Sequence, residues 1–249
     1  MGFSTRFMEN LKNMLRRSLG FAYNPLKELY YWLIYFSFKV FKKRTGTLVY
    51  IGLNNGDSFK KIYYKYEKII GFEPNPYNFN KLQKYNQIKG VTLYPYAVSD
   101  KDGHAFLHLP SNENNAASAS LSDFTEVRDG IRTIEKIKVK TVSLMSILEK
   151  HNIKTIESYV SDIEGYDFEV LNSIKTLIED KSIRSIQVEA CQNHAENPYL
   201  SISNYEHEFD ELLNKNYDKT ARGWGILSKG VFQADRSDSF SIDLLYELK

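Results

Sequence analysis

The sequence predicts an α/β fold in which a mainly parallel sheet is covered by helices on both faces. Three observations support this. After residue 46, short apolar or β-branched runs alternate with segments of helical spacing. The 249 residues are 42% hydrophobic, which is enough to fill one large core. The last two strand-like runs have no helix between them, as is typical of an antiparallel pair at a sheet edge.

Each element is predicted from its own pattern. The parallel strands are expected at 47–52, 68–73, 91–98, 157–162 and 183–189. The helices between them are expected at 57–66, 76–86, 143–151 and 166–179. Two extra strands, 102–109 and 134–142, flank the polar stretch "PSNENNAASASLSDF", which is long enough to be a lid or substrate loop. The closing antiparallel pair is expected within 216–230 and 239–248.

The first 45 residues differ from the rest and are predicted to be a basic, aromatic helical extension of a domain at 46–249. Residues 1–47 carry nine basic and two acidic side chains, a net +7, whereas the remainder carries 24 basic and 29 acidic ones, a net −5. The stretch "LYYWLIYFSFKVF" is too short to span a bilayer, which takes roughly 20 residues. Three interpretations stay open for residues 5–44: helices packed on the domain, a peripheral membrane contact, or a homo-oligomer interface.

Charge and cysteine content narrow the functional class. Because the basic excess is confined to the first segment, a nucleic-acid partner is not expected. Cys191 is the only cysteine, so an intrachain disulfide and a cysteine-based zinc site are excluded. A reducing compartment, most simply the cytoplasm or the inner face of its membrane, is expected.

The stretch "LVYIGLNNGDSF" places Gly52, Asn54 and Gly56 directly after the first strand. Ligands of such folds bind at the carboxyl ends of parallel strands, so this turn is a candidate cofactor site. The third glycine of a dinucleotide-binding motif is missing, because Phe59 occupies its place. A nicotinamide-dependent sugar oxidoreductase is therefore a weaker alternative.

Acidic residues stand at the predicted ends of the strands: Glu73, Asp100, the pair Asp162 and Glu164, and Glu189. Each alone could be a helix cap or a solvated loop end. Together they predict an acidic crevice, which disfavours a cofactor with several phosphates. S-adenosylmethionine fits better, because it carries a sulfonium, an ammonium and a ribose and has no phosphate.

At these residues the sequence resembles the FkbM-type S-adenosylmethionine-dependent methyltransferases. The resemblance covers roughly residues 46–190 and is carried by "YIGLNNGDSF", "GFEPNPYNFNKL", "YAVSDKDG" and "SDIEGYDFEVL". It implies a class I (Rossmann-like) methyltransferase fold with a mixed seven-stranded sheet whose last strand is antiparallel. It also implies methylation of a hydroxyl on a sugar, glycan or related polyhydroxy metabolite, which could be lipid-linked.

The resemblance implies a role for each matching position near the cofactor. Gly52, Asn54 and Gly56 would form the turn beneath the methionine part, and Glu73 would hold the ribose. The other positions would be Ser99 with Asp100 against the adenine, and Asp162 near the ammonium and the reacting methyl group.

Two positions depart from the family pattern: Tyr50 stands where an acid is usual, and Ser143 where an Asp is usual. Tyr50 puts one cofactor contact in doubt and keeps a non-catalytic, membrane-docked module of the same fold as an alternative. We expect Tyr50→Asp to tighten cofactor binding. The change at Ser143 is expected to alter a local cap or turn.

A sugar hydroxyl is a poor nucleophile, so a base is expected beside the methyl group. The candidates are Asp162, Glu164, Glu189 and His194, the last of which follows the predicted strand 183–189. A divalent ion, Mg²⁺ or Mn²⁺, held by Asp162 or Glu164 with Glu189 and His194 is a less favoured alternative.

Overall fold

The computed structural model describes residues 44–110, 119–123, 133–200, 202–223 and 240–249. The chain divides into two compact units, Met1–Arg44 and Thr45–Lys249. The predicted extension, with its membrane or dimer contact, lies almost entirely outside the described residues and stays a prediction. Among the helices that the structure describes, none has the length and apolar character needed to cross a membrane.

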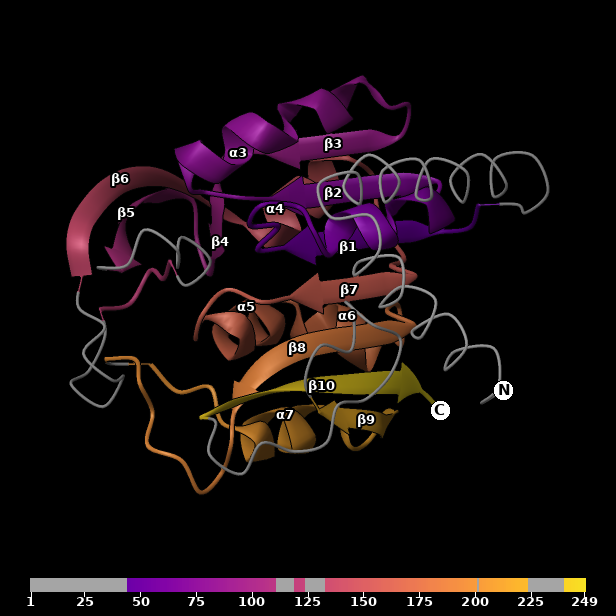
Figure 1. Ribbon diagram of the computed structural model, residues 1–249. Coiled ribbons are helices and arrows are strands. Elements are labelled where there is room, and N and C mark those ends of the chain that lie inside the picture. Colours follow the sequence, from indigo (N-terminus) through magenta and orange to yellow (C-terminus); the bar gives the residue numbers. More distant parts are fainter. Residues whose placement is uncertain (1–43, 111–118, 124–132, 201, 224–239) are drawn as a thin grey trace, which may run out of the picture. The chain divides into compact units, whose positions relative to one another are not determined.

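The second unit is built on the predicted mixed seven-stranded sheet, in the order β3-β2-β1-β7-β8-β10-β9 (Figure 1). The strands are β1 (Thr47–Ile51), β2 (Lys68–Phe72), β3 (Val91–Tyr94), β7 (Ser158–Ser161), β8 (Ser185–Cys191), β9 (Tyr217–Gly223) and β10 (Ser241–Leu248). The pairs between β3 and β8 are parallel, whereas β10 runs antiparallel to both β8 and β9. The α/β class and the antiparallel last strand are thereby confirmed.

The strand order reverses direction at β1, which lies between β2 and β7. A chain that leaves β1 for β2 on one side and returns to β7 on the other opens a crevice at the carboxyl ends of these strands. The turn after β1 and the residues after β2 and β7 therefore meet at one place, and three of the candidate acids, Glu73, Asp162 and Glu164, lie on those connections.

Alternating side chains of β1 enter two cores on opposite faces of the sheet. Val49 and Ile51 belong to one cluster, and Leu48 and Tyr50 belong to the other. The first cluster is covered by α4 (Leu144–Lys150), α5 (Asp167–Ser173), α6 (Lys175–Glu179) and α7 (Glu206–Leu213). The second is covered by η2 (Phe59–Lys61), η3 (Tyr63–Lys65), α3 (Pro76–Leu82) and η4 (Gln83–Gln87). Helices on both faces confirm the predicted layers.

One predicted helix is wrong in type, and one observed helix was not predicted. The helix expected at 57–66 is a pair of 3₁₀ turns, η2 and η3, because its five aromatic and β-branched residues are weak helix formers and Phe59 stacks on Tyr63. The amphipathic helix α7 was not predicted. Its Glu206, which is buried and paired with Lys219 and Arg222, obscures the apolar face that Phe209 forms.

The predicted strand 91–98 is wrong as a single element. Proline at position 95 has no N–H to donate and bends the chain, so β3 ends at Tyr94 and β4 (Ala97–Ser99) begins a second sheet. This three-stranded sheet has the order β4-β6-β5, with β5 (Gly103–Pro110) and β6 (Thr133–Ser143) at the predicted positions. In Figure 1 it stands beside the large sheet, near the labels of α3 and α5.

Candidate active site

The turn after β1 requires glycine at its first position. Gly52 has a φ of +83°, and a Cβ atom there would lie 1.9 Å from the carbonyl oxygen of Asp162. The N–H of Asp162 in turn donates to the carbonyl of Ile51, at 3.1 Å. Only glycine lets the two connections approach so closely, and the turn after β1 is thereby held against the segment that carries Asp162.

The carboxylate of Glu73, directly after β2, holds the same turn. Its two oxygens accept the backbone N–H of Asn54 at 2.6 Å and that of Asn75 at 2.9 Å. Asn54 has a φ of +50° and accepts a further hydrogen bond from the side chain of Asn78. Burial raises the pKa of Glu73 to about 7, although the two backbone N–H groups oppose this shift.

These residues line one pocket that is open to solvent. Its polar wall comes from Gly52, Asn54, Glu73 and Asp162, and none of the described residues that line it is Lys or Arg. Its apolar wall comes from Ile51, Pro74, Tyr96, Ala97, Val98, Leu107, Ala119, Leu121, Ile163 and Tyr166. A pocket with an acidic end and an apolar end suits an amphipathic, positively charged ligand.

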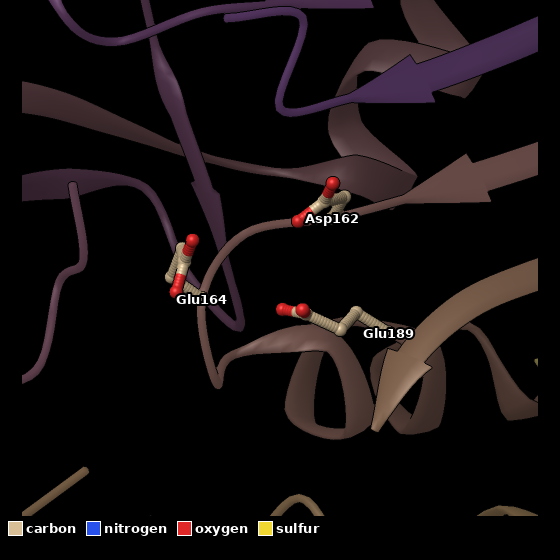
Figure 2. Close-up of side chains that lie close together, drawn as sticks. All are labelled: Asp162, Glu164 and Glu189. Atoms are coloured by element: carbon tan, nitrogen blue, oxygen red, sulfur yellow. The ribbon is translucent and has the colours of Figure 1, made fainter. Parts of the chain in front are cut away.

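Three carboxylates converge beside this pocket. One oxygen atom each from Asp162, Glu164 and Glu189 lies within 4.8 Å of the others, and Figure 2 shows the three groups facing one another. Asp162 follows β7 and Glu164 lies on the turn after it. Glu189 belongs to β8, two residues before the end of that strand, so the predicted end at 189 was too early. These three residues offer the oxygen ligands that a divalent ion prefers.

The surroundings of Asp162 and Glu189 favour the protonated form of each. Asp162 is open to the pocket yet lies deep in the protein, and this loss of bulk water raises its pKa, as do Glu164 and three other acids nearby. Desolvation, followed by the charges of Asp162 and Glu164, likewise raises the pKa of Glu189. Like charges at this separation cannot all remain ionised at low cost, so a proton taken up by Asp162 or Glu189 is shared by the two.

Glu164 is held in the cluster by contacts from two distant segments. The hydroxyl of Tyr199 donates to its Oε2 at 2.6 Å, and that of Ser120 donates to its backbone carbonyl at 2.7 Å. Its φ is +56°, and a Cβ on the next residue, Gly165, would meet the Tyr199 ring at 2.5 Å. Glu164 therefore lies on a turn before α5 and not in the first turn of that helix.

Asp167 is a further buried acid behind the cluster. Its Oδ1 accepts the hydroxyl of Ser161 at 2.5 Å, and both oxygens face the N–H of Ile163. Burial raises its pKa from 3.8 to about 7. The side chain thus orients the backbone on which Asp162 and Glu164 stand.

The raised pKa of Asp167 predicts how stability depends on pH. Between about pH 4 and 7 the folded protein binds more protons than the unfolded chain, so this group's contribution to the free energy of unfolding falls as pH rises, by up to about 4 kcal/mol. In urea unfolding, Asp167→Asn should show a flatter pH dependence than the wild type. The exposed control Asp180→Asn should follow the wild type, and parallel curves for Asp167→Asn would contradict the assignment.

The two departures from the family pattern have structural explanations. The Tyr50 side chain is 3% exposed, packs against Phe59, and is not among the residues lining the pocket. Ser143 is the N-cap of α4, where its hydroxyl accepts the N–H of Ser146 at 3.3 Å. Serine and aspartate are equivalent at this position, so the cap is kept.

Four predicted site residues lie away from the pocket or the cluster. Gly56 supports the turn at a φ of +81°, against Leu82. Ser99 is the last residue of β4, and Asp100 follows that strand. Neither lines the pocket, although Ala97 and Val98 of β4 do. His194 is exposed and outside the carboxylate cluster. Adenine contacts for Ser99 and Asp100 and catalysis by His194 stay predictions.

Two residues of the site were missed by sequence reasoning. Asp243 lies opposite Glu189 in the β8–β10 register, and its charge contributes to the raised pKa of Asp162. The sequence pattern that could have indicated Asp243 is its position as an acid within the mainly apolar stretch "SIDLLYEL". Tyr199 lies in an irregular segment, where no pattern indicated that it would reach Glu164.

The pocket fits S-adenosylmethionine. Gly52 and Asn54 line its turn side, and Glu73 and Asp162 supply negative charge for a cationic ligand. Among the described residues that line the pocket there is no Lys or Arg, which suits a cofactor without phosphates. The apolar wall offers a surface on which a flat ring can lie.

Solved structures with a similar fold share little sequence with the chain. The N-methyltransferase NodS from Bradyrhizobium japonicum WM9 is 9% identical, with a TM-score of 0.44 over 92% of this chain and 99% of its own. Magnesium protoporphyrin IX methyltransferase from Synechocystis PCC 6803, crystallised with S-adenosylmethionine, is 8% identical, with a TM-score of 0.41 over 93% and 86%. No curated protein matches the sequence.

A family model gives the assignment. The FkbM methyltransferase domain matches residues 51–219, which is more than half of the chain. The match contains the glycine turn, Glu73 and the three clustered carboxylates. It decides between the two enzyme classes that the sequence left open, in favour of methyl transfer. The chain belongs to the FkbM family of S-adenosylmethionine-dependent methyltransferases and has the class I fold.

Proposed function

We propose that this methyltransferase acts on a hydroxyl group of a sugar, glycan or related polyhydroxy metabolite. The observation that carries the proposal is the cluster of Asp162, Glu164 and Glu189 beside the cofactor pocket. Carboxylates accept hydrogen bonds from hydroxyls, and a polyol can satisfy several of them at once. The raised pKa values of Asp162 and Glu189 also favour uptake of a proton by these two groups.

When bound, S-adenosylmethionine supplies an electrophilic methyl group on a sulfonium. The acceptor oxygen forms a bond to the methyl carbon as the sulfur–carbon bond breaks, and the hydroxyl proton must leave the oxygen. Glu189 is the acceptor that we assign to this proton, because it faces the cluster without lining the cofactor pocket. Asp162 lines the pocket and belongs to the cluster, so it orients cofactor and acceptor together.

Glu164 has a different role. The hydroxyl of Tyr199 donates to Glu164 and orients its carboxylate toward the cluster, where we expect it to help position the acceptor. Alignment of acceptor and methyl group can supply several kcal/mol, within the roughly 7–11 kcal/mol available from orientation. A divalent ion held by the same three residues would polarise the hydroxyl instead, and a loss of activity in chelator would indicate it.

The proposal is tested with extracts of a deletion strain, in which the natural acceptor lacks its methyl group. Purified protein and S-adenosylmethionine labelled in the methyl group should transfer label to a carbohydrate-containing fraction. Mass spectrometry should then place one added methylene equivalent on a hydroxyl. Label on an amine or on protein would contradict the acceptor class, and no transfer with tight S-adenosylhomocysteine binding would favour the non-catalytic module.

Cofactor binding should depend on the ionised form of Glu73. Glu73→Gln keeps one acceptor for the two backbone N–H groups and removes the charge, so affinity for S-adenosylmethionine should fall about 10- to 100-fold. Because the pKa of Glu73 is about 7, wild-type affinity should weaken as pH falls through 7, more steeply than that of the variant. Isothermal titration calorimetry measures both.

The matched control is Glu67→Gln, an exposed carboxylate just before β2 at the opposite end of the same strand. It should bind the cofactor as the wild type does at every pH. Equal affinities for Glu73→Gln and Glu67→Gln would remove Glu73 from the binding site.

The cellular address also belongs to the proposal. The one cysteine, Cys191, is a buried thiol outside any disulfide and is 1% exposed, which suits a reducing compartment such as the cytoplasm. A lipid-linked acceptor would place the enzyme at the inner face of the membrane.

A further inference from the structure

The two-stranded ribbon of β5 and β6 carries a basic and aromatic face. Residues directly opposite each other in an antiparallel pair lie on the same side of the sheet. The register therefore places three cross-strand pairs on one face: His104 with Lys140, Phe106 with Lys138, and His108 with Lys136.

The opposite face of the ribbon is already buried. Leu107, Leu109 and Val139 form a small core there, and Leu107 also lines the cofactor pocket. The basic face is exposed at its first two pairs, where the Phe106 side chain is 55% exposed, whereas His108 of the third pair is buried. Glu135 lies opposite Leu109 and so belongs to the other face.

Two lysines of this face have no carboxylate partner among the described residues. The Lys140 ammonium lies 4.6 Å from the centre of the Tyr96 ring, and Lys138 forms no ion pair there. Lys136, in contrast, pairs with Asp123 at 3.2 Å. Lys138 and Lys140 also line an open groove between β6 and α3, with a volume of about 720 Å³ and no acid among its lining residues.

Edge protection alone explains only part of this surface. Lysines on the exposed strands of small sheets discourage pairing with other chains. The exposed Phe106 between them adds apolar surface that edge protection does not require. An exposed aromatic ring surrounded by cations suits a partner whose surface carries negative charges above an apolar layer.

We propose that the outer ribbon face, formed by His104, Phe106, Lys138 and Lys140, docks on an anionic lipid bilayer. The ammonium groups would lie beside the lipid phosphates. The Phe106 ring would enter the membrane–water interface, where burial of aromatic side chains is favourable. Because the inner face of the same ribbon is a wall of the cofactor pocket, docking would hold the active site close to acceptors at the bilayer surface.

Flotation of the full chain with vesicles tests the charge requirement. The protein should bind vesicles of three parts phosphatidylcholine to one part phosphatidylglycerol, and should not bind pure phosphatidylcholine. Each lysine near an anionic surface contributes about fivefold to binding, so the double variant Lys138→Gln/Lys140→Gln should bind about 25-fold more weakly. The control pair Lys154→Gln/Lys175→Gln removes two exposed lysines elsewhere and should leave binding nearly unchanged.

A local probe separates this face from any other membrane contact of the chain. Because Cys191 is buried, a cysteine introduced by His104→Cys can be labelled selectively with an environment-sensitive fluorophore. Its emission should shift to the blue on anionic vesicles, whereas a label at Lys175→Cys should not respond. Flotation without a shift at position 104, or undiminished binding of the double-lysine variant, would overturn the proposal. Neither readout requires methyl transfer.

Discussion

Glu189→Gln should lower turnover by about 10²- to 10⁴-fold while leaving the affinity for S-adenosylhomocysteine unchanged. The size of the loss is that typical of removing a general base. Affinity should be kept because Glu189 does not line the cofactor pocket. Glutamine has the shape of glutamate and can still accept a hydrogen bond from the acceptor hydroxyl, but it cannot take its proton. Turnover is measured by label transfer to deletion-strain extract, and affinity by isothermal titration calorimetry.

Two comparison variants sharpen this result. Glu247→Gln makes the same change at an exposed carboxylate of β10, close to the carboxyl end of that strand and away from the cluster. It should keep full turnover. Asp162→Asn should lose turnover and also bind the cofactor more weakly, because Asp162 lines the pocket and belongs to the cluster. Wild-type turnover in Glu189→Gln would contradict its assignment as the proton acceptor, and weaker cofactor binding in that variant would place it in the pocket instead.

The parts of the fold that follow local rules could be predicted from the sequence. The parallel strands were recognisable because buried strands are continuous apolar runs. The glycine turn, Glu73 and Asp162 were found because each follows such a run directly. Parallel strands bring their carboxyl ends to one edge, so sequence position alone predicted that these residues would meet.

The rest depends on contacts between distant segments, which no local pattern encodes. Glu164 is oriented by Tyr199, 35 residues further along the chain. Asp243 reaches the cluster only because β10 pairs with β8 in antiparallel register. The β3–β4 break was missed because apolar content outweighed Pro95 in the pattern. Ser99 and Asp100 followed that misplaced strand, which is why their position relative to the pocket was not foreseen.

Tyr50→Asp should destabilise the protein by about 3–5 kcal/mol, the cost of removing a large buried aromatic side chain. From the sequence alone we expected this variant to bind the cofactor more tightly, because an acid is usual at this position in the family. In the structure the Tyr50 ring is buried between β1 and Phe59, with the ring centres 6.2 Å apart. An aspartate there would leave a cavity and place a second carboxyl near Asp162, whose charge already raises the pKa of Tyr50.

Tyr50→Phe separates packing from polarity at the same site. It keeps the ring and loses only the hydroxyl, which hydrogen-bonds Ser58, so the cost should be about 1 kcal/mol and cofactor binding should be unchanged. Urea unfolding measures stability, and calorimetry measures binding of S-adenosylhomocysteine to whichever variants fold. If the Tyr50→Asp protein were as stable as the wild type and bound the cofactor more tightly, an aspartate at position 50 could still contact the cofactor, and this prediction would be wrong. The expected loss means instead that the neighbouring core has adapted to the ring, and that the negative charge of this pocket comes from Glu73 and Asp162.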